Sequence, residues 1–305
     1  MKLLFVCDPL ASFHLAKDST LAMMREADRR GHTLWVCHTH DLFWLSGQTV
    51  SAQAQRLHIT HDPIAWFDLA PHATHSLASF DAVLMRKDPP FDSEFFYATH
   101  LLGQAEREGA RVYNRPAALR EHPEKLAILE FPQFLSPTLV TRDAQQIRDF
   151  HAQHGDIILK PLDGMGGMGI FRVKADGLNL GGIIETLNRD GAQTVMVQKF
   201  IPAIEQGDKR VLLINGVPVP FCLARIPQGG EVRGIVRPQR DFVARFAQQF
   251  GERGAPRTRA EDGDVHGRES KVEGREPEGS ATRRRNCGRL SRGNFICALY
   301  VPFRG

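Results

Sequence analysis

A glycine-rich loop lies between two short apolar runs in the middle of the chain. Residues 157–173 read Ile-Ile-Leu-Lys-Pro-Leu-Asp-Gly-Met-Gly-Gly-Met-Gly-Ile-Phe-Arg-Val. Glycines allow the backbone to reach positive φ and to approach a ligand closely, and successive N–H groups of a turn can converge on phosphate oxygens. Lys160 would add a positive charge beside them. The pattern predicts a strand–loop–strand flap over a nucleotide, and therefore an enzyme that uses ATP.

Two common glycine motifs do not describe this loop. A P-loop requires Lys-Ser or Lys-Thr after its glycines, and none follows here. A dinucleotide-binding fingerprint requires a helix after its glycines, whereas Ile170-Phe171-Arg172-Val173 is typical of a strand. A hairpin turn that binds no ligand is the competing interpretation.

Other polar residues could complete a nucleotide site. Lys125, in a short helix expected over 124–131, could be a second phosphate ligand or only a solvated helix lysine. The segment Gln198-Lys199-Phe200-Ile201 ends an expected strand, whose edge could present backbone groups to a purine. Asp208 could bind ribose hydroxyls, although an aspartate after Gly207 is also typical of a turn.

Arginines suggest an acidic substrate. Arg210 and Arg225 lie on two expected neighbouring strands, where they could bind a carboxylate in bidentate fashion or form surface salt bridges. Arg86-Lys87-Asp88 follows an apolar run, at the strand end where α/β folds bind ligands. No metal-binding or Ser/His/Asp pattern stands out, and the loop histidines are interpreted as solvated, namely His38, His40, His72 and His75.

Composition limits the class of protein. The 305 residues are 42% hydrophobic, which suits one large or two smaller domains, and the net charge is only +4. The five cysteines are widely spaced, so we expect no disulfide framework and a cytoplasmic location. No apolar run approaches the roughly 20 residues of a membrane span, and the apolar run that starts at Leu3 and ends before Asp8-Pro9 is too short for a signal peptide. We expect neither a membrane nor a nucleic-acid partner.

Periodicity predicts two domains with different sheets. Expected strands near 2–7, 33–37, 81–85 and 111–114 alternate with helices that begin near Asp18 and Phe91, which indicates a parallel α/β sheet over residues 1–120. The irregular segment 32–79 is interpreted as strands and loops that cover one edge of that sheet. Residues 121–234 predict an α+β domain with helices at 145–154 and 182–187, a strand at 194–201, and a hairpin about Asn215-Gly216.

After Gly234 the sequence changes in kind. Residues 249–292 are rich in Gly, Arg, Glu and Pro, a composition that cannot bury enough apolar surface to fold. We expect residues 235–305 to form an aberrant, largely disordered tail, in which only 294–303 could be a strand.

Four long motifs, in order along the chain, resemble bacterial glutathione synthetase, a family of ATP-grasp ligases. The first is residues 85–92, Met-Arg-Lys-Asp-Pro-Pro-Phe-Asp, and the second is the glycine loop from Ile158 to Gly167. The third is residues 207–211, Gly-Asp-Lys-Arg-Val, and the fourth is residues 223–231, Leu-Ala-Arg-Ile-Pro-Gln-Gly-Gly-Glu. The resemblance covers about residues 1–234 and implies a pre-ATP-grasp domain followed by an ATP-grasp domain, incomplete at its C-terminal end.

The resemblance implies an activity and a set of site residues. ATP would phosphorylate the free cysteine carboxylate of γ-glutamylcysteine, and the glycine amine would attack the acyl phosphate to give glutathione, ADP and phosphate. Self-association as a homo-oligomer is also implied. The implied phosphate and nucleotide ligands are Lys125, Lys160, Gly164, Met165, Gly166, Gly167, Gln198, Lys199, Ile201 and Asp208. The residues implied to face the acid and its acyl phosphate are Arg210, Arg225 and Arg233.

The chain also departs from the family pattern. The family continues from Arg-Gly into a glycine-rich lid, and then supplies an Asp and a Glu-x-Asn that hold Mg²⁺ (or Mn²⁺). Here Arg233-Gly234 is followed by Ile235-Val236-Arg237-Pro238, and no Glu-x-Asn follows. We therefore assign no metal ligand, and we hypothesise a shift of reading frame after Gly234 that impairs activity. A non-catalytic nucleotide-binding or acid-binding remnant, and an ATP-grasp ligase with another substrate, remain the alternatives.

Overall fold

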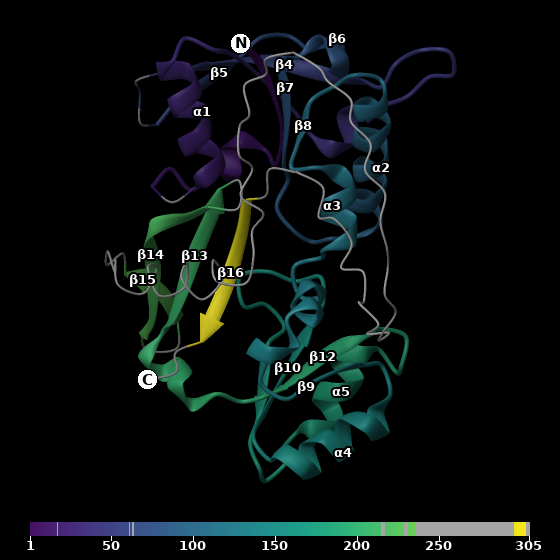
Figure 1. Ribbon diagram of the computed structural model, residues 1–305, viewed down its shortest axis with the longest axis vertical. Helices are drawn as coiled ribbons and strands as arrows, with labels where there is room; N and C mark the ends of the chain where they lie inside the picture. Colours follow the sequence, from purple (N-terminus) through teal and green to yellow (C-terminus); the bar gives the residue numbers. More distant parts are fainter. Residues whose placement is uncertain are drawn as a thin grey trace, which may run out of the picture.

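The computed structural model describes residues 1–235, except 17, 61, 63, 215, 216, 229 and 230, together with residues 296–302. Side chains are described up to Leu223. The expected turn at Asn215-Gly216 and the composition-based disorder of 249–292 lie outside the described residues. Figure 1 shows three sheets, one in the upper part of the view and two below it.

The first sheet has eight strands and a parallel centre. Its main order is β3-β4-β2-β1-β7-β8, and β5 and β6 also pair with β4. The parallel strands are β1 (Lys2–Cys7), β2 (Thr33–Cys37), β7 (Ala82–Arg86) and β8 (Val112–Tyr113). The antiparallel edge, which the sequence predicts as strands and loops, consists of β3 (Leu42–Phe43), β4 (Ser51–Ile59), β5 (Phe67–Leu69) and β6 (Ala73–Ser76).

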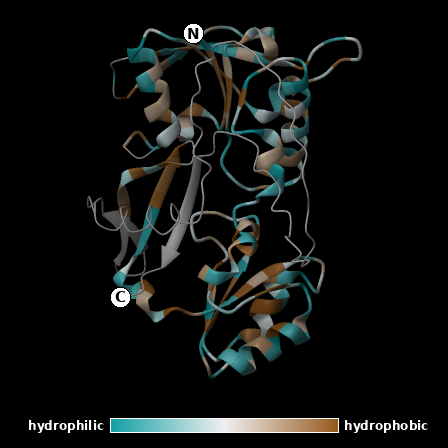
Figure 2. Cartoon of the chain, in the orientation of Figure 1, coloured by the Kyte–Doolittle hydropathy of each residue, from teal (hydrophilic) through white to brown (hydrophobic). Residues whose placement is uncertain are grey.

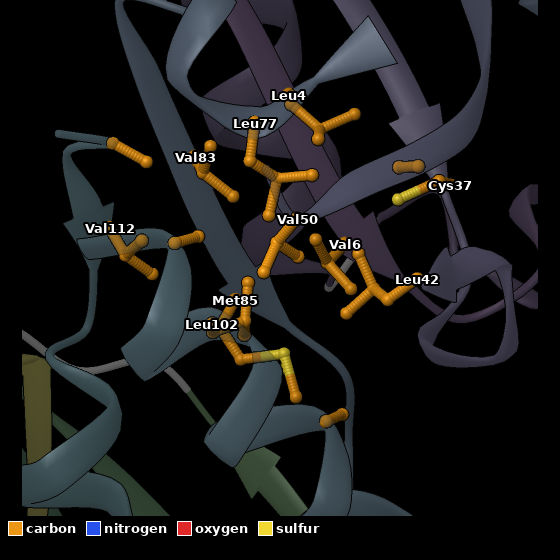
Figure 3. Packing of buried hydrophobic residues seen from close by; sticks show 14 of the residues in the cluster. Leu4, Val6, Cys37, Leu42, Val50, Leu77, Val83, Met85, Leu102 and Val112 are labelled. Atoms are coloured by element: carbon orange, nitrogen blue, oxygen red, sulfur yellow. The ribbon is translucent and has the colours of Figure 1, made fainter. Parts of the chain in front are cut away.

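Alternation along β1 assigns its side chains to two cores. Leu4 and Val6 belong to a core that also contains Leu102 of helix α2 (Ser93–Arg107), as Figure 3 shows. Phe5 belongs to the core on the other face, with Leu21 of helix α1 (Ser19–Arg29). Because successive side chains of a strand point to opposite faces, the uninterrupted apolar run of β1 is the expected pattern for a strand covered on both sides.

Aspartates determine where three helices begin. Asp18 accepts hydrogen bonds from two backbone N–H groups at the start of α1, and Asp92 accepts one at the start of α2. Asp143 caps helix α4 (Ala144–His154) in the same way, through the N–H groups of Gln145 and Gln146. Each cap stabilises its helix by about 1 kcal/mol, because it satisfies donors that have no partner inside the helix. A short helix α3 (Pro116–Glu121) follows β8.

The second sheet is antiparallel and has the order β11-β10-β12-β9. Its strands are β9 (Thr138–Thr141), β10 (Ile157–Pro161), β11 (Phe171–Val173) and β12 (Val195–Lys199). Helices α4 and α5 (Leu180–Asn188) pack on it through a core that contains Ile147, Ile157 and Ile184. Figure 2 shows hydrophobic colouring along these strands and hydrophilic colouring over much of α4, as expected for a helix with one solvated face.

The third sheet has the order β15-β14-β13-β16, and all its pairs are antiparallel. Strands β13 (Asp208–Ile214) and β14 (Val217–Gln228) form the predicted hairpin, and β15 (Glu231–Ile235) extends it. The expected C-terminal strand is present as β16 (Ile296–Pro302), which pairs with β13 along its whole length. A segment that follows the change in composition thus supplies a neighbour to β13.

Short 3-10 helices complete the described chain. They are η1 (Leu10–Ser12), η2 (Thr39–Asp41), η3 (Leu77–Ser79), η4 (Leu126–Glu130), η5 (Pro132–Phe134) and η6 (Pro202–Gln206). Among the described residues, no helix is both long and apolar enough to span a membrane.

Candidate nucleotide site

The glycine loop joins two antiparallel strands, as the sequence predicts. Ile157 pairs with Val173 and Leu159 with Phe171, so β10 and β11 form a hairpin whose connection is residues 162–170. Gly166, Gly167 and Gly169 have φ values of +64°, +84° and +70°, a region that other residues rarely adopt. Met165 and Met168 project into solvent from the loop. The backbone conformation of the loop therefore favours glycine at these three positions.

Lys125 reaches the loop from a distant part of the chain. Its Nζ donates a very short hydrogen bond to the carbonyl oxygen of Gly164, 39 residues away in sequence. Lys125 is the N-cap of η4, so the short helix expected over 124–131 is present as a 3-10 helix that begins two residues later, at Leu126. It ends at Glu130 because Pro132 disfavours helical geometry in Phe131, the residue before it.

Lys160, at the end of β10, contacts the neighbouring strand. Its Nζ donates to Oε1 of Gln198 at 2.7 Å, and Nε2 of Gln198 donates to Oγ1 of Thr138 on β9 at 2.9 Å. These three side chains come from adjacent strands because Gln198 is paired with Ile158 on one side and with Thr138 on the other. Thr138 was not a candidate from the sequence, since no local signal links it to a residue 60 positions away.

The positive charge of Lys125 affects the protonation of Lys160. Burial lowers the pKa of Lys160 below its ordinary value, and the positive charge of Lys125 lowers it further, against a smaller opposing effect of Glu124. Within the part of the chain that the structure describes, neither ammonium group forms a salt bridge with a carboxylate. Two cations that approach one glycine loop without an anionic partner are suited to bind phosphate.

The expected adenine-binding segment lies at the end of β12. The backbone N–H of Lys199 donates to Pro137 at 3.0 Å, and that of Phe200 donates to Asp156 at 2.9 Å. Ile201 follows as the half-buried N-cap of η6. Two of the backbone donors in this segment are therefore engaged within the protein.

The ring of Phe200, in this segment, is covered by an arginine. The guanidinium carbon of Arg172 lies 3.5 Å from the ring centroid of Phe200, and Arg172 also forms two hydrogen bonds of 2.6 and 2.9 Å with Asp156. The sequence analysis did not identify this contact, because the three residues are brought together only by the pairing of β10 with β11 and β12.

The predicted acid-binding arginines lie in the third sheet. Asp208 and Arg210 are on β13, and the backbone of Arg225 on β14 is paired with that of Asp208. Arg233 on β15 is paired with Ile226. The side chains of Arg225 and Arg233 lie outside the described side chains, so the structure gives their positions only as strand register.

A small cavity lies beside the start of the glycine loop. Its volume is about 210 Å³, and its lining combines Pro89 and Phe91, residues 123–126, and residues 162–164. This volume is below the roughly 300–1,000 Å³ of typical ligand sites, so the cavity could hold only part of a nucleotide. The sequence analysis did not predict that Pro89 and Phe91 line one cavity together with the start of the glycine loop.

Several charged residues lie where β1 and β7 end, a few residues before Pro89 in the sequence. Arg86 donates to the hydroxyls of Thr20 and Ser19 at 3.0 and 2.9 Å. Asp8 forms a 2.8 Å ion pair with Lys87. Burial lowers the pKa of the Arg86 guanidinium and raises that of the Asp88 carboxyl. These groups occupy the sheet edge at which parallel α/β folds bind ligands.

The described residues contain no group of three His, Cys, Asp or Glu side chains that could hold a metal ion. The acidic cluster Glu261-Asp262-Gly263-Asp264 lies outside them. Since Mg²⁺ requires several oxygen ligands, the described part of the chain does not fit a protein-held Mg²⁺ site.

Family patterns match most of the chain. The prokaryotic glutathione synthetase N-terminal domain matches residues 1–120, and the ATP-grasp domain of the same enzymes matches residues 124–245. A glutathione synthetase from Ralstonia nicotianae is 57% identical over 234 residues, which are 77% of this chain and 72% of that protein. A second, from Nitrosomonas europaea, is 52% identical over 263 residues, or 83% of this chain and 82% of that protein.

Solved structures share the fold. A D-cycloserine synthetase superposes with a TM-score of 0.54 at 17% identity, over 80% of this chain and 78% of that chain. The D-alanyl-alanine synthetase A of Vibrio cholerae gives a TM-score of 0.53 at 13% identity, over 83% and 79%. At such low identity these similarities concern the fold alone.

Proposed function

Since the chain belongs to the prokaryotic glutathione synthetase family of ATP-grasp ligases, we propose that its two lysines and its glycine loop are the parts that hold ATP. The family activity is an ATP-dependent carbon–nitrogen ligation whose substrates are γ-glutamylcysteine and glycine. The observation that carries the proposal is that Lys125 donates to the glycine loop and lies close enough to Lys160, which ends the strand before that loop, to lower the pKa of Lys160.

Each proposed part has a defined task. Lys125, Lys160 and the backbone of Gly164, Met165, Gly166 and Gly167 bind the phosphates and offset charge that develops during transfer. Gln198, Lys199 and Ile201 line the adenine site, and Asp208 binds the ribose. ATP, when bound, supplies the phosphoryl group that activates the carboxylate of γ-glutamylcysteine. The flap keeps water away from the activated acid, which water would otherwise hydrolyse.

Arginines of the third sheet are the proposed partners of the acid. Arg210, Arg225 and Arg233 orient the carboxylate and stabilise its acyl phosphate, because a guanidinium binds such anions in bidentate fashion. The register of β13, β14 and β15, which keeps these positions in one sheet, supports this assignment. Glycine then attacks the acyl carbon through its amine.

Metal binding is the part of the family activity that the described residues do not fit. The family uses Mg²⁺, but the described residues supply no ligand cluster, and the sequence after Gly234 contains no Glu-x-Asn. We infer that this chain binds nucleotide but turns it over slowly or not at all. The altered segment after Gly234 is the proposed cause.

A coupled assay for ADP release tests the proposal. Release that depends on both γ-glutamylcysteine and glycine supports the ligase, whereas saturable ADP binding without turnover supports the nucleotide-binding remnant. Turnover with other amino acids in place of glycine would indicate a different ATP-grasp ligase. Absence of both ADP binding and turnover contradicts the proposed site.

Three further properties are proposed with it. Residues 1–120 form the substrate domain, 121–234 the ATP-grasp domain, and 235–305 a tail with no catalytic role. The protein is a cytoplasmic homo-oligomer without nucleic-acid or membrane partners. The free thiols of Cys7, Cys37 and Cys222 are consistent with a reducing compartment. Cell fractionation and light scattering test location and assembly.

A further inference from the structure

A hydrogen-bond chain begins at the ammonium group of Lys160 and passes through the hydroxyl group of Thr138. Lys160 donates to Oε1 of Gln198 at 2.7 Å, Nε2 of Gln198 donates to Thr138 at 2.9 Å, and Thr138 donates to the carbonyl of Ser136 at 2.8 Å. We propose that Thr138 is a positioning residue of the nucleotide site, acting through the Gln198 amide on Lys160. This inference rests on the proposed function, in which Lys160 and Gln198 are nucleotide ligands.

Only one direction of the chain satisfies every group. An ammonium group can only donate hydrogen bonds, so Gln198 must present its oxygen to Lys160. The single proton of the Thr138 hydroxyl is used on the carbonyl of Ser136, so toward Gln198 the hydroxyl oxygen can only accept. The amide nitrogen of Gln198 must therefore face Thr138, and a flipped amide would place its N–H groups against the ammonium.

The strand pairing makes this arrangement rigid. Thr138, Gln198 and Lys160 lie on β9, β12 and β10, three adjacent strands of one sheet. Gln198 is held at both ends of its amide, and Lys160 is held by Gln198 at a partly buried position. A partly buried ammonium that loses its acceptor either moves or leaves a donor unsatisfied, and both outcomes are unfavourable.

Substitution of Thr138 should therefore weaken nucleotide binding without contact between Thr138 and the nucleotide. Thr138→Val keeps the shape and removes the hydroxyl, which leaves the Gln198 N–H without its acceptor and lets the amide move away from Lys160. Loss of a hydrogen bond that orients a charged group corresponds to about a tenfold rise in the Kd for ADP. Thr138→Ser keeps the hydroxyl and should rescue binding to within about threefold of the unsubstituted chain.

A second background separates positioning from a general structural role. In Gln198→Glu, either carboxylate oxygen can accept from Lys160, so no amide orientation remains to be selected. Thr138→Val in that background should change the Kd for ADP by less than about threefold. A Thr138 that only stabilised the sheet would weaken ADP binding by the same factor in both backgrounds.

The experiment is a calorimetric titration of ADP into the full 305-residue chain. The variants are Thr138→Val, Thr138→Ser, Gln198→Glu and the Val/Glu double variant, with thermal unfolding as the control for folding. Should Thr138→Val fail to fold, Thr138→Ala replaces it with the same expected loss. Equal losses in both backgrounds, or no loss with Thr138→Val, overturn the inference and leave the proposed nucleotide site intact. Failure of the unsubstituted chain to bind ADP overturns both.

Discussion

Lys125 and Lys160 approach the glycine loop in different environments. Lys125 donates to the loop itself, through the carbonyl of Gly164, whereas Lys160 is partly buried and donates to Gln198. Because burial favours the neutral form of an amine, the pKa of Lys160 is lowered, and its ammonium group loses its proton at a lower pH than an ordinary lysine does. Phosphate binding restores the charge of Lys160, since the bound anion favours the protonated form.

The first prediction concerns the pH dependence of ADP binding. Affinity should fall as the pH rises through the lowered pKa of Lys160, because binding requires the ammonium form. Lys160→Arg should remove this alkaline decline, since a guanidinium stays protonated. Titrations from pH 7 to pH 10.5 measure the effect, and the exposed Lys174→Arg is the matched control. An alkaline decline that persists in Lys160→Arg would contradict the assignment.

The free energy of unfolding should also depend on pH through Lys160, but in the opposite direction to ADP affinity. The folded-state pKa of Lys160 is below its unfolded value, so the unfolded chain binds more protons between the two values. The free energy of unfolding should therefore rise with pH across this window, while ADP affinity falls. Denaturant unfolding of the unsubstituted chain and of Lys160→Met measures the difference. Parallel pH profiles for the two proteins would exclude Lys160 as the source.

At the scale of elements, the flap depends on glycines that other residues cannot replace. A Cβ atom on Gly169 would lie 3.1 and 3.2 Å from the ring carbons of Pro161, and φ is +70°. Gly169→Ala should destabilise the flap by about 1–2 kcal/mol and weaken ADP binding. Gly182→Ala is the control, because Gly182 lies in α5 with open space around its Cβ position. That control should raise stability by about 1 kcal/mol, as alanine is favoured over glycine in helices.

Chemical unfolding and ADP titration of both glycine variants test this prediction. Loss of ADP affinity in Gly169→Ala, with little change in Gly182→Ala, is the expected pair of results. Equal affinity in both variants would show that the flap tolerates a side chain at Gly169 and is not shaped for close contact with a ligand.

A second element-scale prediction concerns an aromatic cluster between β2 and β6. His75 lies 4.3 Å from the ring of Trp35 and 5.7 Å from that of Phe80, measured between centroids. Burial lowers the pKa of His75, and the nearby ammonium of Lys2 lowers it further. The unfolded chain then binds more protons below pH 6.5, so stability should fall as the pH drops through this range.

Thermal unfolding between pH 7.5 and pH 5.5 measures the contribution of His75. His75→Gln should flatten the acid decline relative to the unsubstituted chain, because glutamine does not titrate. The exposed His72→Gln serves as the control and should leave the decline unchanged. An unaltered decline in His75→Gln would assign the acid sensitivity to other groups.

At the scale of the whole molecule, the sequence predicts most of the architecture and part of the site. The apolar run of β1 and the glycine loop carry strong local signals, and both are confirmed by the strands and hairpin observed. The short helix expected over 124–131 is present, but it is shorter than expected, because Pro132 disfavours helical geometry in the residue before it. Contacts such as Thr138 with Gln198 depend on pairing between distant strands, which local patterns do not encode.

The segment after Gly234 provides a further whole-molecule prediction. A chimera that replaces residues 235–305 with the corresponding segment of the Ralstonia nicotianae relative should gain turnover, if the altered segment is the cause of impairment as proposed. Its ADP affinity should stay within about threefold of the original chain, since Lys125, Lys160 and the flap are unchanged. Coupled assays and titrations measure both quantities. A chimera that folds but gains no turnover would contradict the proposed cause of impairment.

The most direct test is the titration of ADP into the full chain and into the Lys125→Gln/Lys160→Gln double variant. We predict saturable binding by the unsubstituted chain and a rise in Kd of at least about 100-fold in the double variant, as two charged contacts to phosphate are lost. Equal affinity in the two proteins, or no binding by the unsubstituted chain, would contradict the account.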